Sequence, residues 1–153
     1  MTVSMNVSLD ELNKFARTFA SKGFKVKVGI MGSKAHSKHK GSNVSNAEIG
    51  MTHEYGSFSK HIPMRSFLRM PLFMKTTRII TIIGARALGY LIKGNKKQIF
   101  VELGIICEQV IHEAFATHGF GQWAPRKVSG DGHPLLWKTG QLQRSITSQV
   151  TNK

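Results

Sequence analysis

Apolar residues recur every three to four positions near the start of the chain and predict an amphipathic helix over residues 9–22. Ser8 and Glu11 have the spacing of a capping box, in which the two residues satisfy each other's free backbone N–H groups. Gly23 is a natural stop for this helix. Its apolar face consists of Leu9, Leu12, Phe15, Ala16 and Phe19.

Two longer helices are predicted in the middle of the chain. The first begins near Pro71, which is tolerated in a first helical turn, and extends to about Lys93. The second is expected over residues 96–117, where the apolar stripe has helical spacing. That stripe consists of Ile99, Leu103, Ile106, Cys107, Val110 and Ala114.

Alternation of apolar and polar residues predicts two strands. Over residues 24–30 the apolar positions face a core, while Lys25 and Lys27 face solvent. Residues 145–150 have the pattern of a closing strand. The predicted fold is therefore α+β, with a small mixed or antiparallel sheet packed against two or three helices. A length of 153 residues suits a single domain, residues 1–153.

Shorter elements connect these segments. Asn46 is expected to cap a helix that runs to about Tyr55, with Gly56 as its stop. Residues 33–43 are rich in lysine, histidine and serine, which predicts a mobile basic loop. In a second loop, residues 122–133, Trp123 is the expected anchor and residues 130–132 a turn; Thr139 is expected to cap a short helical turn.

The charge distribution is strongly basic, with 22 Lys and Arg against 8 Asp and Glu and a net charge of +14. Residues 55–101 contain no acid. Such a field favours nucleic acid, anionic membrane surfaces or acidic protein partners, and it also serves general solubility. The nine basic residues in this acid-free stretch are Lys60, Arg65, Arg69, Lys75, Arg78, Arg86, Lys93, Lys96 and Lys97.

Catalytic and metal-binding patterns are weak. His36 and His39 lie among lysines with no acid or cysteine nearby, so a solvated basic loop is the expected reading. His53-Glu54 begins like a zinc-protease helix, but Ser57 stands where the second histidine is needed. Cys107 lies in an apolar run and is expected to be a small buried hydrophobe. We therefore expect no enzyme, no cofactor and no metal site.

The chain is also expected to be soluble. Its most apolar stretch, residues 79–92, is interrupted by Arg86 and is shorter than the roughly 20 residues that a membrane span needs. The first residues lack the order of charged and apolar segments found in signal peptides.

Several local patterns follow one another at characteristic distances: Val28–Gly32, Asn46–Gly50, His53–Ser57, Ile62–Arg69, Trp123–Pro125 and Pro134–Ile146. In this order they resemble the tail-completion and virion-morphogenesis proteins of tailed bacteriophages. These include the Mu-type morphogenesis protein and tail components of long-tailed phages. The resemblance covers about residues 24–150. The chain departs from the family at Met64 and Ser66, where a charged or small residue followed by proline is common, and in its lysine-rich segment 33–43.

The resemblance implies a structural virion protein that completes the tail and joins it to the head at the neck. It implies a homo-oligomeric ring, of sixfold symmetry, around the DNA channel, in contact with neighbouring head–tail connector and tail proteins. It also implies a location in the virion, and in the host cytoplasm during assembly, with no membrane partner. The alternative is a sequence-independent nucleic-acid-binding protein, because basic charge without a base-reading module favours contact with phosphates.

Two sets of residues carry these expectations. Candidates for an interface or for the wall of the DNA channel are Arg65, Arg69, Lys75, Arg78, Lys93, Lys96, Lys97, Lys34, Lys38 and Lys40. Motif residues expected to maintain the fold are His53, Glu54, Tyr55, Gly56, Pro63, Phe67, Leu68, Trp123, Thr139, Gly140, Leu142 and Ser145.

Overall fold

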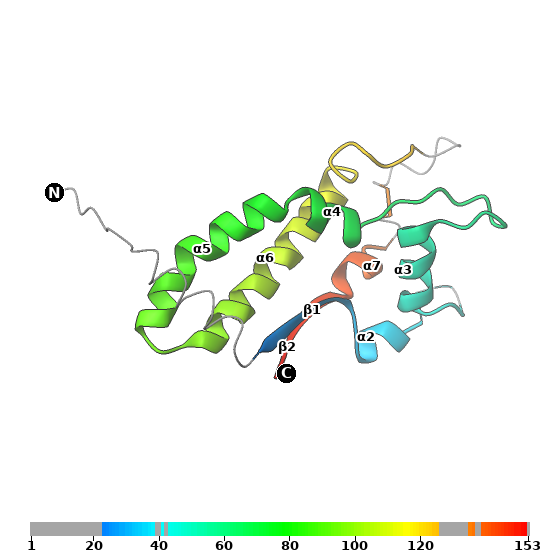
Figure 1. Cartoon of the computed structure of the whole chain (residues 1–153). Coiled ribbons are helices and arrows are strands. Elements are labelled where there is room, and N and C mark those ends of the chain that lie inside the picture. Colours follow the sequence, from blue (N-terminus) through cyan, green and yellow to red (C-terminus); the bar gives the residue numbers. More distant parts are fainter. Residues whose placement is uncertain (1–22, 39–40, 42, 126–134, 137–138, 153) are drawn as a thin grey trace.

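The structure is a computed structural model that describes residues 23–38, 41, 43–125, 135–136 and 139–152. The helix predicted over residues 9–22 and the turn predicted at 130–132 lie outside the described residues, as does Lys40. The elements are β1 (Phe24–Ile30), α2 (Ser33–His36), α3 (Asn46–Tyr55), α4 (Arg69–Met74), α5 (Thr76–Ile92), α6 (Lys96–Ala116), α7 (Gln141–Arg144) and β2 (Ile146–Asn152). The chain has the predicted α+β fold (Figure 1).

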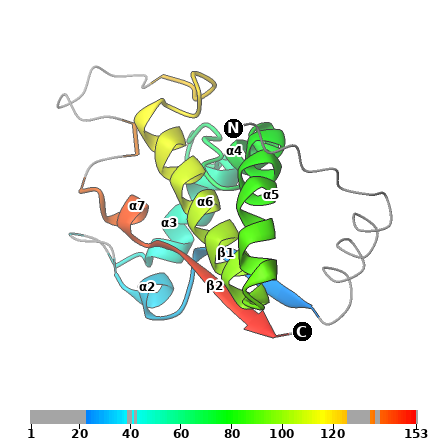
Figure 2. The same ribbon diagram turned by 90° about the vertical axis from the view of Figure 1, so that its left-hand side faces the viewer.

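The two strands form an antiparallel ribbon in which Phe24 pairs with Asn152 and Ile30 pairs with Ile146. Both predicted strands are confirmed, and Lys25 and Lys27 are exposed as expected. Helix α6 packs against both strands (Figure 2). Close packing requires a glycine at position 104, because a Cβ there would lie only 2.5 Å from Ser148 Oγ on β2.

Helices α5 and α6 form a long hairpin. Ile79 on α5 and Ile106 and Val110 on α6 form one buried cluster between them. Two ion pairs also link α5 to α6: Arg86 Nη1 lies 2.7 Å from Glu102 Oε2, and Arg78 Nη1 lies 2.6 Å from Glu113 Oε2. The helix predicted over residues 96–117 is confirmed, because α6 ends only one residue earlier, at Ala116.

The single helix predicted from Pro71 to Lys93 is wrong, because the chain forms two helices with a break at Lys75. Directly after the break, the Thr76 hydroxyl donates to the carbonyl oxygens of Leu72 and Phe73, at 3.0 and 2.8 Å. Hydroxyls that bond to the preceding turn tend to bend a helix, and they compete locally with its regular pattern.

The structure also differs from the predicted irregular loop after β1. Residues 33–36 form the single turn of α2, and Lys38 makes an isolated bridge with Ser45. The cap of α3 is Ser45 and not Asn46: the Ser45 hydroxyl accepts from Glu48 N, and the Glu48 carboxylate accepts from Ser45 N. Asn46 is buried instead, and its amide donates to Lys34 O at 3.0 Å.

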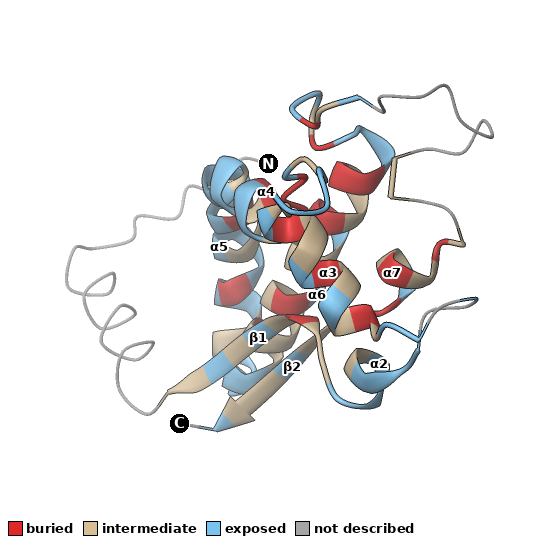
Figure 3. Cartoon of the chain, turned by 90° about the vertical axis from the view of Figure 1, so that its right-hand side faces the viewer, coloured by how far each residue is buried: buried red, intermediate tan, exposed pale blue. Residues whose placement is uncertain are grey.

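The C-terminal segment contains the predicted short helical turn, but its N-cap residue is Gly140, with φ of 64°, and not Thr139. The Thr139 hydroxyl, one position earlier, accepts from Gln141 N at 3.2 Å. Leu142 and Ile146 are both buried. Figure 3 shows that buried residues gather where α3, α6 and α7 meet the ends of the strands.

Candidate functional site

The motif residues converge on Glu54, at the end of α3. The residue is 5% exposed, and its two carboxylate oxygens accept four hydrogen bonds. One oxygen accepts from Ser66 Oγ at 2.6 Å and from Arg69 N at 3.1 Å. The other accepts from Phe67 N at 2.9 Å and from Leu68 N at 3.0 Å. A buried carboxylate is tolerated when its lone pairs are satisfied in this way.

These hydrogen bonds provide acceptors for backbone N–H groups at the start of α4. The first N–H groups of a helix have no partner within the helix, and Leu68, the N-cap residue of α4, makes no capping side-chain hydrogen bond. Two other side chains act as acceptors: Glu54, from α3, accepts from Arg69 N, and Ser66 Oγ accepts from Met70 N at 3.0 Å. The charge of Glu54 also suits the positive end of the helix dipole. The Arg69 guanidinium lies 3.9 Å from Glu54 and 5.1 Å from the centre of the Tyr55 ring.

A second link joins the same segment to the Trp123–Pro125 motif. The Arg65 side chain is buried and donates from Nε to Ala124 O at 2.9 Å and from Nη2 to Pro125 O at 3.2 Å. The indole N–H of Trp123 donates to Ser66 O at 3.0 Å. Residues nearly 60 positions apart are thus held together by three side chain–backbone bonds.

The third motif completes the apolar side of the site. Phe67 and Leu142 are buried in one cluster with Phe115 and Trp123. The Phe115 ring lies 5.3 Å from the Phe67 ring and 5.6 Å from the Trp123 indole, edge-on to the indole. A Cβ on Gly50 would lie 3.4 Å from Phe67 and 3.7 Å from Leu142, so α3 packs closely here. We call the combined unit of Glu54, Arg65, Ser66, Phe67, Trp123 and Leu142 the motif joint.

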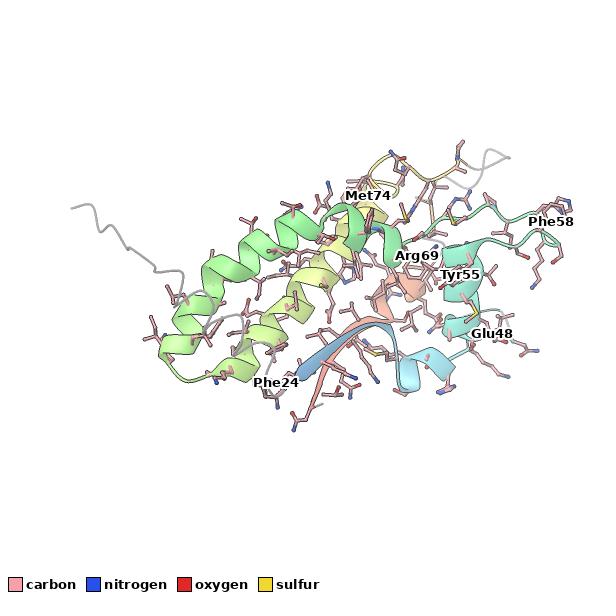
Figure 4. The ribbon with its side chains drawn as sticks, in the orientation of Figure 1. Phe24, Glu48, Tyr55, Phe58, Arg69 and Met74 are labelled. Atoms are coloured by element: carbon pink, nitrogen blue, oxygen red, sulfur yellow. The ribbon has the colours of Figure 1, made fainter. Side chains whose placement is uncertain are left out.

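A hairpin projects from the motif joint. Ser57 and Ile62 pair as an antiparallel bridge, and Arg65 N donates to His53 O at 2.8 Å at its base. Gly56 has φ of 75°, and a Cβ there would lie 2.9 Å from Met64 N, so only glycine fits. Figure 4 shows Phe58 at the far end of this hairpin, and its side chain is fully exposed.

The structure changes the picture of the basic candidates. The predicted surface position of Arg65 is wrong, because distant carbonyl groups hold its guanidinium in the interior. Arg78 is paired with Glu113, and the Lys75 ammonium lies 4.2 Å from the centre of the Phe120 ring. Residues 55–101 contain no acid, but acidic side chains of α6, such as Glu113, therefore lie against basic residues of this stretch.

Other basic candidates remain at the surface. Lys34 donates to Arg144 O, and Lys38 donates to Asn43 Oδ1 at 3.4 Å. Lys93, Lys96 and Lys97 are all exposed at the turn between α5 and α6. These three lysines form a group at the end of the hairpin where α5 turns into α6.

A shallow cavity of about 440 Å³ lies beside the motif joint, between the start of α4 and the segment after α6. Its lining is mainly apolar, and three exposed methionines contribute to it: Met64, Met70 and Met74. The other described lining residues are Ser66, Pro71, Gly119, Gln122 and Trp123, so none of the described lining residues is an acid, a histidine or a cysteine. The cavity is thus suited to apolar contact and lacks acid–base groups.

The remaining chemistry is limited. Within the ranges that the structure describes, no three His, Cys, Asp or Glu side chains lie together in a way that could hold a metal ion. Cys107 is half-buried and not fully buried as predicted. Burial nevertheless raises the pKa of its thiol, which disfavours the reactive thiolate. No helix in the described part of the chain is long and apolar enough to cross a membrane.

Comparison with known proteins gives no relative: no family model matches the chain, and no curated protein or solved structure matches it.

Proposed function

We propose that this chain is a structural virion protein that completes the tail of a bacteriophage and joins it to the head, as one subunit of a ring around the DNA channel. The proposal rests on the order of motifs in the sequence. The observation that carries it further is the motif joint, in which patterns far apart along the chain meet in one place.

The joint is architectural in its chemistry. The Glu54 carboxylate, the Ser66 hydroxyl, the Arg65 guanidinium and the Trp123 indole all bind protein groups inside the unit. Catalytic groups must instead present atoms to a substrate in a cleft. The polar atoms of the motif joint make hydrogen bonds that hold segments of the chain together, and this supports a structural role.

Exposed apolar groups support assembly with other proteins. Phe58, Phe73 and Met51 are 100%, 75% and 67% exposed and belong to different elements. Apolar surface of this kind commonly marks contact sites between proteins. In a ring, each subunit uses two different surfaces, one for each neighbour, which suits apolar groups spread over separate parts of the molecule.

The exposed lysines at positions 93, 96 and 97 are the best remaining candidates for contact with DNA or with acidic faces of neck proteins. Contacts of either kind should weaken as salt rises. Replacing all three by glutamine should leave folding intact, because these side chains are exposed at a turn. As a matched control, Lys25 and Lys27 are also exposed but lie on the sheet.

The direct test is genetic. A phage that carries this gene with an early stop codon should produce filled heads and free tails that fail to join, and supplied wild-type protein should restore complete virions. Electron microscopy of lysates distinguishes these products. Normal virions from the defective phage would contradict the proposal. So would preference for one DNA sequence by a hundredfold, about 2.7 kcal/mol, over random DNA.

A further inference from the structure

Phe58, at the tip of the hairpin that projects from the motif joint, is held in a fixed position although it is fully exposed. Ser57 and Ile62 exchange two backbone hydrogen bonds, of 2.8 and 2.9 Å, and His61 N donates to Phe58 O at 3.1 Å. The Ser57 hydroxyl also accepts from Lys60 N at 3.3 Å. A group that is held in place before binding loses little conformational entropy when it binds, so the Phe58 side chain is preorganised for contact.

The cavity beside the motif joint can receive such a side chain. We call it the methionine cavity, after Met64, Met70 and Met74, which line it and are 52%, 41% and 42% exposed. Its volume is about 440 Å³, whereas a cavity of about 150 Å³ is large enough for benzene. Methionine side chains adapt their shape, and their sulfur atoms make favourable contacts with aromatic groups. The methionine cavity therefore fits a phenyl group together with part of the loop that carries it.

Phe58 does not occupy the methionine cavity of its own chain. Its side chain is fully exposed, and Figure 4 shows it at the far end of the hairpin, well away from Met74. Each copy of the chain therefore presents an aromatic tip at one place and an apolar cavity at another. Two complementary surfaces on the same chain allow each copy to bind the next one in the same way.

We propose that Phe58 of one copy inserts into the methionine cavity of the next copy. Repetition of this head-to-tail contact closes a ring of subunits when the rotation between copies permits it. A large aromatic side chain that fills a pocket commonly supplies much of the binding energy of an interface. The inference rests on the proposed function, because it names the surfaces through which the subunits of that ring bind one another.

Charge sets the expected salt dependence of this contact. Lys60 lies two positions after Phe58, and Lys75 directly follows Met74, so both sides of the contact carry positive charge. Repulsion between these charges opposes association, and salt screens it. Self-association should therefore strengthen as salt rises, whereas contacts with DNA phosphates weaken. Self-association that weakened with salt would contradict the apolar contact.

Removal of the aromatic side chain is the first test. Phe58→Ser alters a fully exposed residue, so the full chain should still fold. Phe73→Ser is the matched control, because Phe73 is 75% exposed and does not line the methionine cavity. Sedimentation velocity of nuclease-treated protein measures self-association. We expect wild type and Phe73→Ser to associate alike, and the dissociation constant of Phe58→Ser to rise about thirtyfold, or about 2 kcal/mol.

Obstruction of the cavity is the second test. Met74→Lys places an ammonium group at the cavity, and this group would have to lose its water when Phe58 enters, which is unfavourable. Met51→Lys is the matched control, because Met51 is also exposed but lies on α3 outside the methionine cavity. Circular dichroism checks that both variants fold. We expect Met74→Lys alone to weaken self-association, again by about thirtyfold.

A mixture of Phe58→Ser and Met74→Lys protein tests whether the two surfaces bind each other. The mixture offers one intact aromatic tip and one intact cavity for each pair of chains, so it should form dimers and nothing larger, while each variant alone is monomeric. A mixture that stays monomeric would overturn the proposal. Wild-type protein that stays monomeric up to about 1 mM, or Phe58→Ser protein that associates as wild type does, would also overturn it.

These results are separate from the test of the proposed function. If self-association does not depend on Phe58 and Met74, but the phage with the early stop codon still yields unjoined heads and tails, only the proposed contact is wrong. If the contact is present and that phage yields normal virions, the proposed function is wrong.

Discussion

Glu54→Gln is the sharpest test of the motif joint. The amide nitrogen would replace one of two oxygens that each accept two hydrogen bonds. The less damaging orientation places it where Ser66 and Arg69 now donate, because the serine hydroxyl, which already accepts from Met70 N, can accept a second hydrogen bond. The Arg69 backbone N–H then faces another donor, and the bonds from Phe67 and Leu68 go to a neutral oxygen.

The magnitude follows from the bonds affected. A hydrogen bond to a charged group contributes about 1.5–3 kcal/mol, and one between neutral groups about 0.5–1.5 kcal/mol. Losing the bond from Arg69 N and changing the other three from charged to neutral gives about 5 kcal/mol, from which the relief of burying a charge subtracts part. We expect a net loss of about 3 kcal/mol, a large share of the 5–15 kcal/mol typical of a domain.

Urea unfolding at pH 7, followed by circular dichroism, measures this loss. With a slope of about 1–3 kcal/mol per molar urea, the midpoint should fall by about 1–3 M. Glu48→Gln is the control, since it makes the same change in the same helix at an exposed carboxylate, and should shift the midpoint far less. If Glu54→Gln and Glu48→Gln unfolded at the same urea concentration, the carboxylate of Glu54 would not be what holds α4 to α3.

Three further predictions concern separate parts of the molecule. Arg65→Gln should lower the free energy of unfolding by about 2 kcal/mol, because the buried guanidinium and its hydrogen bonds to Ala124 O and Pro125 O are lost. A melting temperature equal to wild type would contradict the buried position of Arg65. Gly89→Ala should stabilise the protein by about 0.5–1 kcal/mol, because its Cβ would lie in a helix and meet no atom of the described residues within 4 Å. Gly104→Ala should destabilise the protein, because its Cβ would contact Ser148 on β2. Calorimetry compares the two variants, and the same sign for both would refute the packing of α6. Hydrogen bonds from the Ser45 backbone N–H and hydroxyl lower the pKa of Glu48 below its ordinary value of 4.5. The stability that this cap contributes is therefore complete above pH 4.5 and is lost as the pH falls through the lowered pKa. Carboxyl titration by NMR should show a higher Glu48 pKa in Ser45→Ala, and an unchanged pKa would contradict the capping box.

The sequence predicted the elements whose causes are local. The alternation over residues 24–30 and the stripe of residues 96–117 each depend on neighbours along the chain, and both elements are present. The break at Lys75 was missed, because the two helices carry one nearly continuous apolar pattern and Thr76 gives only a weak local signal.

The motif joint was predicted only as a set of residues that maintain the fold. Three of the four hydrogen-bond donors to Glu54 are backbone N–H groups 13 to 15 positions away, and the acceptors for Arg65 are carbonyl groups about 60 positions away. Backbone groups are the same in every sequence, so no pattern identifies them as partners. For that reason a basic residue in an acid-free stretch was expected at the surface, although its donors are used inside.

The hairpin that carries Phe58 has a consequence for how this protein could diversify. Both of its ends are fastened: Glu54 holds the start of α4 to the end of α3, and His53 O accepts from Arg65 N. Residues between such fixed ends can change in identity or number at small entropic cost, since doubling a loop's length adds only about 0.6 kcal/mol. The fold and the tip can therefore vary independently, so that one scaffold could present different aromatic or charged tips to different neighbours.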